Sequence, residues 1–181
     1  MSIKDVYMYV FQRTQWEIGR LWQTNKLTVA EEHIFTAATQ LIMSQLYPYL
    51  FGETDFKGKV IAACVGRELH EVGLRMVADF LEMDGWNTIY VGANTPTRTL
   101  LETISKEHPD IIALSITIIP HLKNLRDVIK HIRDNRNFNH IKIIVGGYPF
   151  IQENRLWKQV NADGSAINAE EAVKLANQFF E

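Results

Sequence analysis

The sequence has little of several features that would each indicate a particular class of protein. It has one cysteine in 181 residues, Cys64, which excludes an internal disulfide framework and, within an apolar run, indicates a buried side chain. Its formal net charge of −2 shows no excess of positive charge, which argues against contact with the phosphate backbone of nucleic acids. It lacks a secretory signal, and no apolar run approaches the roughly 18 residues that a membrane span needs. We therefore expect a soluble, cytoplasmic protein without direct contacts to nucleic acid or membrane.

Sequence motifs of the common catalytic sites are also missing. We find no Ser-His-Asp pattern, no Walker phosphate-binding loop, no protein-kinase motif and no His-Glu-x-x-His zinc site. We therefore predict that the chain is not an enzyme by itself.

What is present is a change of periodicity along the chain. Residues 3 to about 50 are typical of two helices, and the second begins with a capping box made by Thr28 and Glu31. From residue 55 onward, short apolar runs alternate with helical segments, which is typical of an α/β protein with right-handed crossovers. We expect a flavodoxin-like, Rossmann-like domain at 55–181, with a five-stranded parallel sheet in the order 2-1-3-4-5, and an N-terminal two-helix cap, a partial bundle, at 1–54. The strands are expected near 59–65, 87–92, 111–116, 141–146 and 160–162, and the helices near 71–84, 97–107, 121–135, 151–158 and 168–180.

Three short motifs stand at the carboxyl ends of predicted strands. Glu68-Leu69-His70-Glu71-Val72-Gly73 follows the first strand, Ser115-Ile116-Thr117 ends the third, and Gly146-Gly147 ends the fourth. The carboxyl ends of parallel strands share one edge of the sheet, where open α/β sheets bind their ligands. A histidine there can offer one nitrogen to a metal while the other donates to a carboxylate, here Glu68. Taken singly, His70 reads as a surface or capping residue and Gly146-Gly147 as a turn, so the joint spacing carries the prediction of a ligand site.

The spacing of these motifs resembles the cobalamin-binding domain, whose pattern is Asp-x-His-x-x-Gly, then Ser-x-Leu, then Gly-Gly. Two positions depart from that pattern, because Glu68 stands for Asp and Thr117 for Leu. The resemblance implies that His70 replaces the dimethylbenzimidazole of cobalamin as lower cobalt ligand, and that the displaced nucleotide tail runs into the sheet. The implied cofactor site comprises Glu68, Leu69, His70, Glu71, Val72, Gly73, Ser115, Thr117, Gly146 and Gly147, with Thr95 and Thr97 as further polar contacts.

The helical pair resembles the cap of cobalamin-dependent photoreceptors and related sensory regulators. Trp22 ends the first predicted helix and Glu32-His33 begin the second, which matches the cap motif Trp-x9-Glu-His. The resemblance implies that these three side chains cover the upper face of the corrin ring. On their own, Trp22 reads as an apolar helix residue and Glu32 as a carboxylate that is favourable at a helix start.

Two functions are open at this point. The cap motif and Glu68 favour a cobalamin-binding sensory or regulatory module that acts in signalling or transcription regulation. The alternative is a corrinoid carrier that passes a methyl group between methyltransferases, and a haem sensor is a third, weaker interpretation. We expect adenosyl-, methyl- or hydroxocobalamin as cofactor, and either a homo-oligomer or a fused or associated signalling output domain as partner. The other histidines, His108, His121, His131 and His140, are expected to be solvated side chains without a ligand role.

Overall fold

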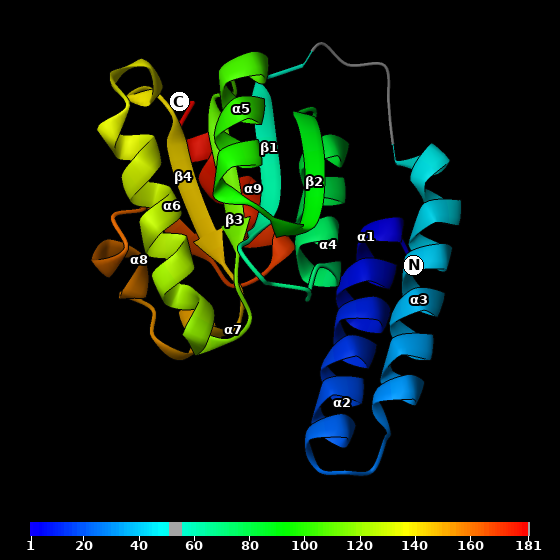
Figure 1. The fold of residues 1–181 in the computed structure, drawn as a ribbon. Coiled ribbons are helices and arrows are strands. Elements are labelled where there is room, and N and C mark those ends of the chain that lie inside the picture. The colour runs from blue at the N-terminus through cyan, green and yellow to red at the C-terminus, as the bar shows by residue number, and fades with distance from the viewer. Residues whose placement is uncertain (51–55, 181) are drawn as a thin grey trace. The chain divides into compact units, whose positions relative to one another are not determined.

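The computed structural model describes residues 1–50 and 56–180, which form two compact units (Figure 1). One unit spans Met1–Gly52 and the other Glu53–Glu181. The expected domain boundary between residues 54 and 55 lies outside the described residues. No helix within the described parts of the chain is both long enough and apolar enough to cross a membrane.

The first unit is an antiparallel pair of helices. The first runs through α1 (Ile3–Asp5), a π-helical segment (Val6–Phe11) and α2 (Gln12–Gln23), and the second is α3 (Val29–Leu46), followed by a 3-10 turn (Tyr47–Tyr49). The predicted capping box is confirmed, because the Thr28 hydroxyl accepts from the amide of Glu31 and the Glu31 carboxylate accepts from the amide of Thr28. The amide of Gln15 donates to the Thr39 hydroxyl across the helix pair at 2.8 Å. The π-helical segment was not predicted.

The second unit contains the predicted flavodoxin-like sheet, with five parallel strands in the order β2-β1-β3-β4-β5. Its elements are β1 (Lys59–Val65), α4 (Val72–Met83), β2 (Asn87–Thr95), α5 (Thr97–Glu107), β3 (Ile111–Ser115), α6 (Leu122–Asp134), β4 (Lys142–Gly146), α7 (Tyr148–Gln152), α8 (Leu156–Gln159), β5 (Gly164–Ala166) and α9 (Ala169–Gln178).

Two predictions in this unit are wrong. The helix expected at 151–158 is split into α7 and α8, and the fifth strand lies at Gly164–Ala166 rather than 160–162. Val160 instead caps α8, and Asn161 takes a left-handed conformation with a φ of 61° that turns the chain. The carboxylate of Asp163 then accepts from the amide of Ile143 at 2.6 Å, so β5 begins only after this connection to β4.

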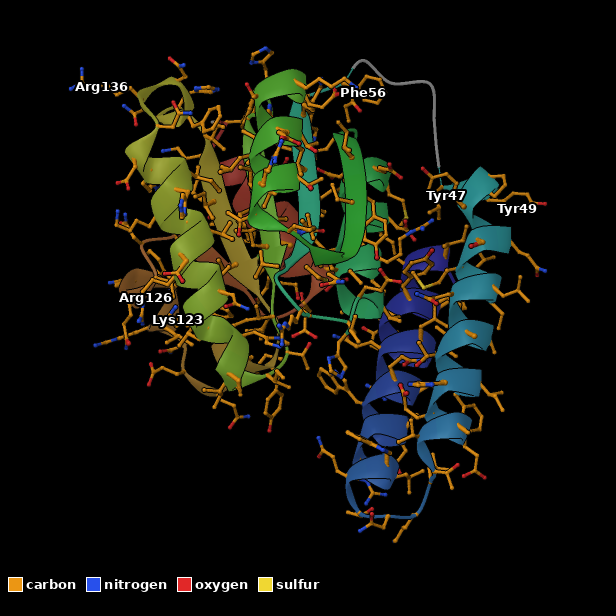
Figure 2. The ribbon with its side chains drawn as sticks, viewed as in Figure 1. Tyr47, Tyr49, Phe56, Lys123, Arg126 and Arg136 are labelled. Carbon is orange, nitrogen blue, oxygen red and sulfur yellow. The ribbon has the colours of Figure 1, made fainter. Side chains whose placement is uncertain are left out.

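Alternation along the strands divides the core between the two faces of the sheet. Ile61, Ala63 and Val65 of β1 pack with buried residues of α5 and α6. Val60, Ala62 and Cys64 point the other way and pack with α4 and α9, the helices behind the sheet (Figure 1). On α6 the charged side chains Lys123 and Arg126 project away from the sheet (Figure 2), so the helix is amphipathic.

Candidate functional site

A buried carboxylate, Glu68, lies at the centre of the carboxyl edge of the sheet. Its Oε1 accepts from the backbone amide of His70 at 2.9 Å and from His70 Nδ1 at 2.5 Å. Its Oε2 accepts from the backbone amide of Thr117 at 2.6 Å and from His121 Nδ1 at 3.0 Å. The carboxylate therefore joins the loop after β1 to the loop after β3.

The loop that carries Glu68 is held in place by backbone hydrogen bonds from β2. The carbonyl of Glu68 accepts from the amide of Asn94 at 2.8 Å, and the amide of Gly66 donates to the carbonyl of Thr95 at 3.2 Å. Gly66 has a φ of 61°, and a Cβ at this position would lie 2.6 Å from the side chain of Asn124. A glycine is therefore needed there for the turn into the Glu68 segment.

The surroundings of Glu68 keep it ionised. Burial acts to raise its pKa, but the hydrogen bonds from His70, Thr117 and His121 together lower that pKa well below its ordinary range. An ionised carboxylate only accepts hydrogen bonds, so both imidazoles donate through Nδ1. A metal at His70 would then be bound through Nε2, and the His70 side chain is 56% exposed.

The assignment of His121 as a solvated histidine is wrong. Its side chain is only 13% exposed, and its Nδ1 lies 3.0 Å from Glu68 Oε2. Its position could have indicated this contact, because His121 immediately precedes α6, at the same sheet edge as Glu68. The prediction failed because His121 has no ligand-type neighbour close to it in the sequence.

Small residues form a row across the sheet at the same edge. Cys64 pairs in register with Ser115, Ser115 with Gly146, and Gly146 with Ala166. By strand alternation this row faces α4 and α9, because Cys64 and Ala166 belong to the core on that side. The thiol of Cys64 donates to the carbonyl of His70 at 3.6 Å, and burial raises its pKa to about 12.

The three predicted glycines differ in the space that a side chain at each position would find. Gly147 has a φ of 100°, and a Cβ there would lie 1.9 Å from the carbonyl oxygen of Ile116, so the fold itself requires glycine. A Cβ at Gly146 would lie 3.1 Å from the carbonyl oxygen of Ala166, which is a tight contact. A Cβ at Gly73, in the first turn of α4, would meet no atom within 4 Å. The fold leaves open space at Gly73 alone among these three.

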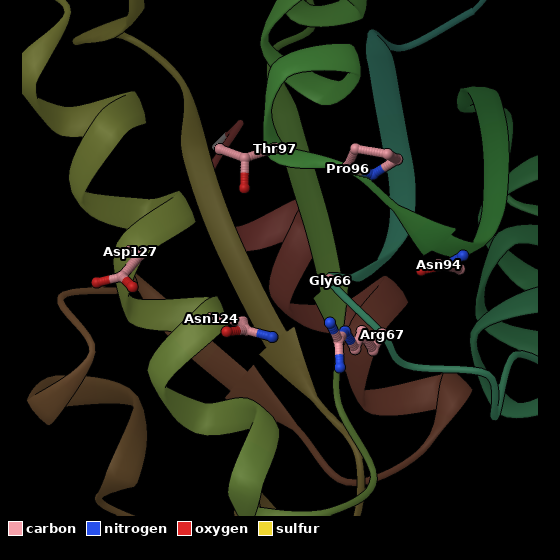
Figure 3. A pocket seen from close by; sticks show the side chains of 7 residues that line it. All are labelled: Gly66, Arg67, Asn94, Pro96, Thr97, Asn124 and Asp127. Carbon is pink, nitrogen blue, oxygen red and sulfur yellow. The ribbon is translucent and has the colours of Figure 1, made fainter.

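Other predicted residues lie in different surroundings. Thr95 is buried, and its hydroxyl donates to the carbonyl of Gly92 at 3.1 Å. Thr97 lines a pocket of about 360 Å³ between α5 and α6, together with Arg67 and Asn124 (Figure 3). This pocket is on the face opposite the row of small residues, and none of the predicted glycines lines it. Its full lining comprises Gly66, Arg67, Asn94, Pro96, Thr97, Asn124 and Asp127.

The neighbours of His70 in the sequence divide between core and surface. Val72 is buried, and the carboxylate of Glu71 accepts from the hydroxyl of Tyr90 at 3.0 Å and from the amide of Ala93 at 2.8 Å. Glu71 therefore fastens the start of α4 to β2. Leu69, by contrast, is strongly exposed.

Leu69 is one of several exposed apolar side chains at this edge of the sheet. They come from the segments that follow β1, β3, β4 and β5; they are Leu69, Ile118, Ile119, Tyr148, Ile151 and Ile167. Phe56, also exposed, lies beyond the opposite end of the sheet (Figure 2). Such a concentration of exposed apolar surface marks a place where a ligand or partner is bound.

The predicted cap residues lie in the helical unit. Trp22 is 41% exposed near the end of α2. Near the start of α3, Glu32 accepts from the hydroxyl of Thr36 at 2.8 Å, and His33 Nε2 lies 3.6 Å from the Glu32 carboxylate. The loop between the helices, residues 24–28, brings the two helix ends to one end of the pair.

The donor set tests which kind of group could bind here. Within the described residues, no three His, Cys, Asp or Glu side chains are arranged to hold a metal ion by themselves. The fold and the site define an α/β protein that holds one carboxylate-backed imidazole at the carboxyl edge of its parallel sheet.

The comparison with known proteins identifies the family. Residues 58–176 match the family model described as B12 binding domain, and residues 1–47 match a second model of the same description. The chain therefore belongs to the B12 binding domain family.

Three known proteins show what the chain is similar to. Dimethylamine corrinoid protein 2 of Methanosarcina acetivorans is 26% identical over 166 residues, which are 91% of this chain and 74% of that protein. The structure of the Methanosarcina barkeri monomethylamine corrinoid protein aligns with a TM-score of 0.87 at 18% identity, over 98% of this chain and 84% of that one. A chain of the methanol:cobalamin methyltransferase complex of Methanosarcina barkeri aligns with a TM-score of 0.63 at 18% identity, over 97% of this chain and 67% of that one.

These names correct the functional prediction. The interpretation as a sensory module for signalling or transcription regulation is wrong, because a relative matched over nearly the whole chain is a dimethylamine corrinoid protein. The expected signalling output domain is wrong for the same reason. The expectation that the chain is at most a methyl carrier, and not itself an enzyme, agrees with these relatives.

Proposed function

We propose that this protein is a corrinoid carrier that passes a methyl group between methyltransferases. The observation that carries the proposal is the Glu68–His70 pair, which is held from two loops at the ligand-binding edge of a B12 binding domain. The corrinoid proteins among the relatives support the choice of a carrier over a sensor. A bound corrinoid would supply the chemistry itself, because its cobalt accepts a methyl group from one partner and yields it to another.

The role proposed for His70 is that of lower cobalt ligand, in place of the cofactor's own dimethylbenzimidazole. Glu68 fixes its Nδ1–H tautomer, orients the ring and increases the basicity of Nε2. Because both Glu68 oxygens are held by backbone amides, the carboxylate is fixed and would keep the His70 imidazole in one direction.

The role proposed for the row of small residues is to admit the displaced nucleotide tail. Ser115 and Gly146 lie side by side on the face of the sheet that α4 and α9 cover. Gly73 leaves open space at the first turn of α4. The exposed apolar side chains around His70, such as Leu69 and Ile119, would support the underside of the corrin ring. Thr97 is still proposed as a polar contact to the cofactor. The buried hydroxyl of Thr95, by contrast, already donates a hydrogen bond to the carbonyl of Gly92.

The helical unit is proposed to shield the upper face of the corrinoid through Trp22, Glu32 and His33. The support is the match of residues 1–47 to a B12 binding domain model. Which upper ligand the resting protein carries, adenosyl, methyl or hydroxyl, stays open in this proposal. The partners proposed are methyltransferases and a second copy of the chain, and the cytoplasm is the proposed location.

A methyl-transfer assay tests the carrier function. Tagged protein is loaded with hydroxocobalamin, reduced with titanium(III) citrate, and mixed with soluble extract of the organism that produces it. Isotope-labelled methanol, monomethylamine, dimethylamine or trimethylamine is then supplied as methyl donor. We expect the re-isolated protein to carry label on its corrinoid with one of these donors and only with extract present. No labelling from any donor, with a fully loaded protein, would contradict the proposal.

A further inference from the structure

We propose that two copies of this protein associate through α3, by packing an exposed apolar stripe of this helix, antiparallel, against the same stripe of the second copy. Ala38 lies at the two-fold axis of the pair. The inference goes beyond the carrier function and does not depend on it, because none of the proposed cofactor residues belongs to this stripe.

The stripe is a face of α3 that the helical unit does not use for its own packing. The face turned to α2 carries the buried Thr39, whose hydroxyl accepts from Gln15. A second face carries large apolar side chains at distances of three and four residues from Ala38, which itself is exposed. Residues at such spacings are neighbours on a helix surface. The α3 stripe comprises Ala38 with Ile34 (66% exposed), Phe35 (44%), Leu41 (62%) and Ile42 (46%).

The order of residues along the α3 stripe is nearly the same from either end. Ile34 and Ile42 lie four residues on either side of Ala38, and Phe35 and Leu41 lie three residues on either side. If two α3 helices cross antiparallel at Ala38, Ile34 meets Ile42 of the partner subunit and Phe35 meets Leu41 of the partner subunit. The stripe therefore complements itself, as a two-fold interface requires. The small side chain at the centre lets the two helix axes approach closely.

The charges at the ends of the α3 stripe favour the antiparallel orientation. Glu31 lies seven residues before Ala38 and Gln45 seven residues after it, and both side chains are exposed. An antiparallel pair places Glu31 opposite Gln45 of the partner subunit. A parallel pair would instead bring the acidic first turns of the two helices, each with Glu31 and Glu32, to the same end, where they repel.

The mass of the full chain in solution, measured by light scattering at micromolar concentration, tests the interface. We expect the wild type to have twice the 20.9 kDa of one chain. Ala38→Arg should reduce the mass to that of one chain, because it places two like charges at the axis. Ala37→Arg is the matched control, since Ala37 is also exposed but lies about 100° around the helix, and it should keep the wild-type mass.

A mixing experiment tests the orientation. Ile34→Glu and Ile42→Lys should each have the mass of one chain when measured alone, because each places a charge against an apolar side chain of the partner subunit. An equal mixture of the two should recover the doubled mass. In the antiparallel pair the new carboxylate faces the new ammonium group, and the other Ile34–Ile42 contact stays intact. Circular dichroism shows that each variant keeps its helices.

Three results would overturn the proposal. A wild type with the mass of one chain would show that the α3 stripe does not bind a second copy. A doubled mass that persists in Ala38→Arg, or that is lost equally in Ala37→Arg, would place the interface on another surface. A mixture of Ile34→Glu and Ile42→Lys that keeps the mass of one chain would contradict the antiparallel register.

Discussion

Gly73→Val is the substitution that should weaken cobalamin binding without lowering the stability of the fold. A Cβ at Gly73 would meet no atom within 4 Å, so the apoprotein has room for the new side chain. Gly73 lies in the first turn of α4, where replacing glycine removes a helix-destabilising residue, and we expect unfolding stability to stay equal or to rise by up to about 0.5 kcal/mol. A nucleotide tail that passes this turn would collide with the valine.

The expected loss of cobalamin affinity follows from the cost of overpacking a close contact. That cost is about 1–3 kcal/mol, which corresponds to roughly a 5- to 150-fold rise in Kd. Isothermal titration calorimetry with hydroxocobalamin measures the affinity, and thermal unfolding of the apoprotein measures the stability. Gly19→Val is the matched control, because Gly19 on α2 also has open space around it.

Comparison with other glycines shows why Gly73 is the informative position. Gly146→Val should also weaken cobalamin binding, but its Cβ would press on the carbonyl of Ala166 at 3.1 Å in the apoprotein as well. Wild-type affinity in Gly73→Val, with the fold intact, would refute the path proposed for the tail.

Three further predictions concern Glu68, Cys64 and the helical unit. Because the pKa of Glu68 is lowered on folding, its ionisation stabilises the protein above the ordinary carboxyl pKa, and this contribution is lost as the pH falls toward the lowered value. Glu68→Gln should therefore lower the unfolding free energy by about 1.5–3 kcal/mol at neutral pH, and by less below roughly pH 4. Urea titrations at neutral pH and below roughly pH 4 measure this loss, and an equal loss under both conditions would contradict the prediction. Cys64, with its pKa raised to about 12, should not react with a thiol reagent at pH ~8 until the protein unfolds, so rapid labelling of the native protein would count against its burial. The exposed Trp16, Ile34 and Leu41 of the helical unit should drive self-association, and light scattering that shows only monomer at micromolar concentrations would refute it.

The sheet could be predicted from the sequence because its signals are local and repeated. Apolar runs such as Val60–Val65 alternate with helical segments, and that pattern alone indicates parallel strands. The fifth strand was misplaced because Gly164–Ala166 has only three residues and little apolar character, whereas Val160 merely caps a short helix. The position of this strand depends on Asp163, which accepts a hydrogen bond from the amide of Ile143, twenty residues earlier in the sequence.

The candidate site was predictable where a motif fixes the neighbours, as in the pair of Glu68 and His70. It was missed where the contact crosses between loops. His121 meets Glu68 across 53 residues, and no spacing rule within one motif reports that distance. The function was misjudged for a related reason, since Trp22, Glu32 and His33 form a short motif, whereas the relationship to methylamine corrinoid proteins extends over nearly the whole chain.

The electron paramagnetic resonance spectrum of cob(II)alamin bound to the full chain tests most directly whether His70 holds the cobalt of a corrinoid. The protein is produced with histidine that carries the heavy nitrogen isotope, while the cobalamin keeps the ordinary isotope. A protein imidazole as lower ligand then splits the cobalt lines into doublets, whereas the cofactor's own dimethylbenzimidazole splits them into triplets. We predict doublets for the wild type and their loss in His70→Ala. Triplets in the labelled wild type, or doublets that persist in His70→Ala, would contradict the account.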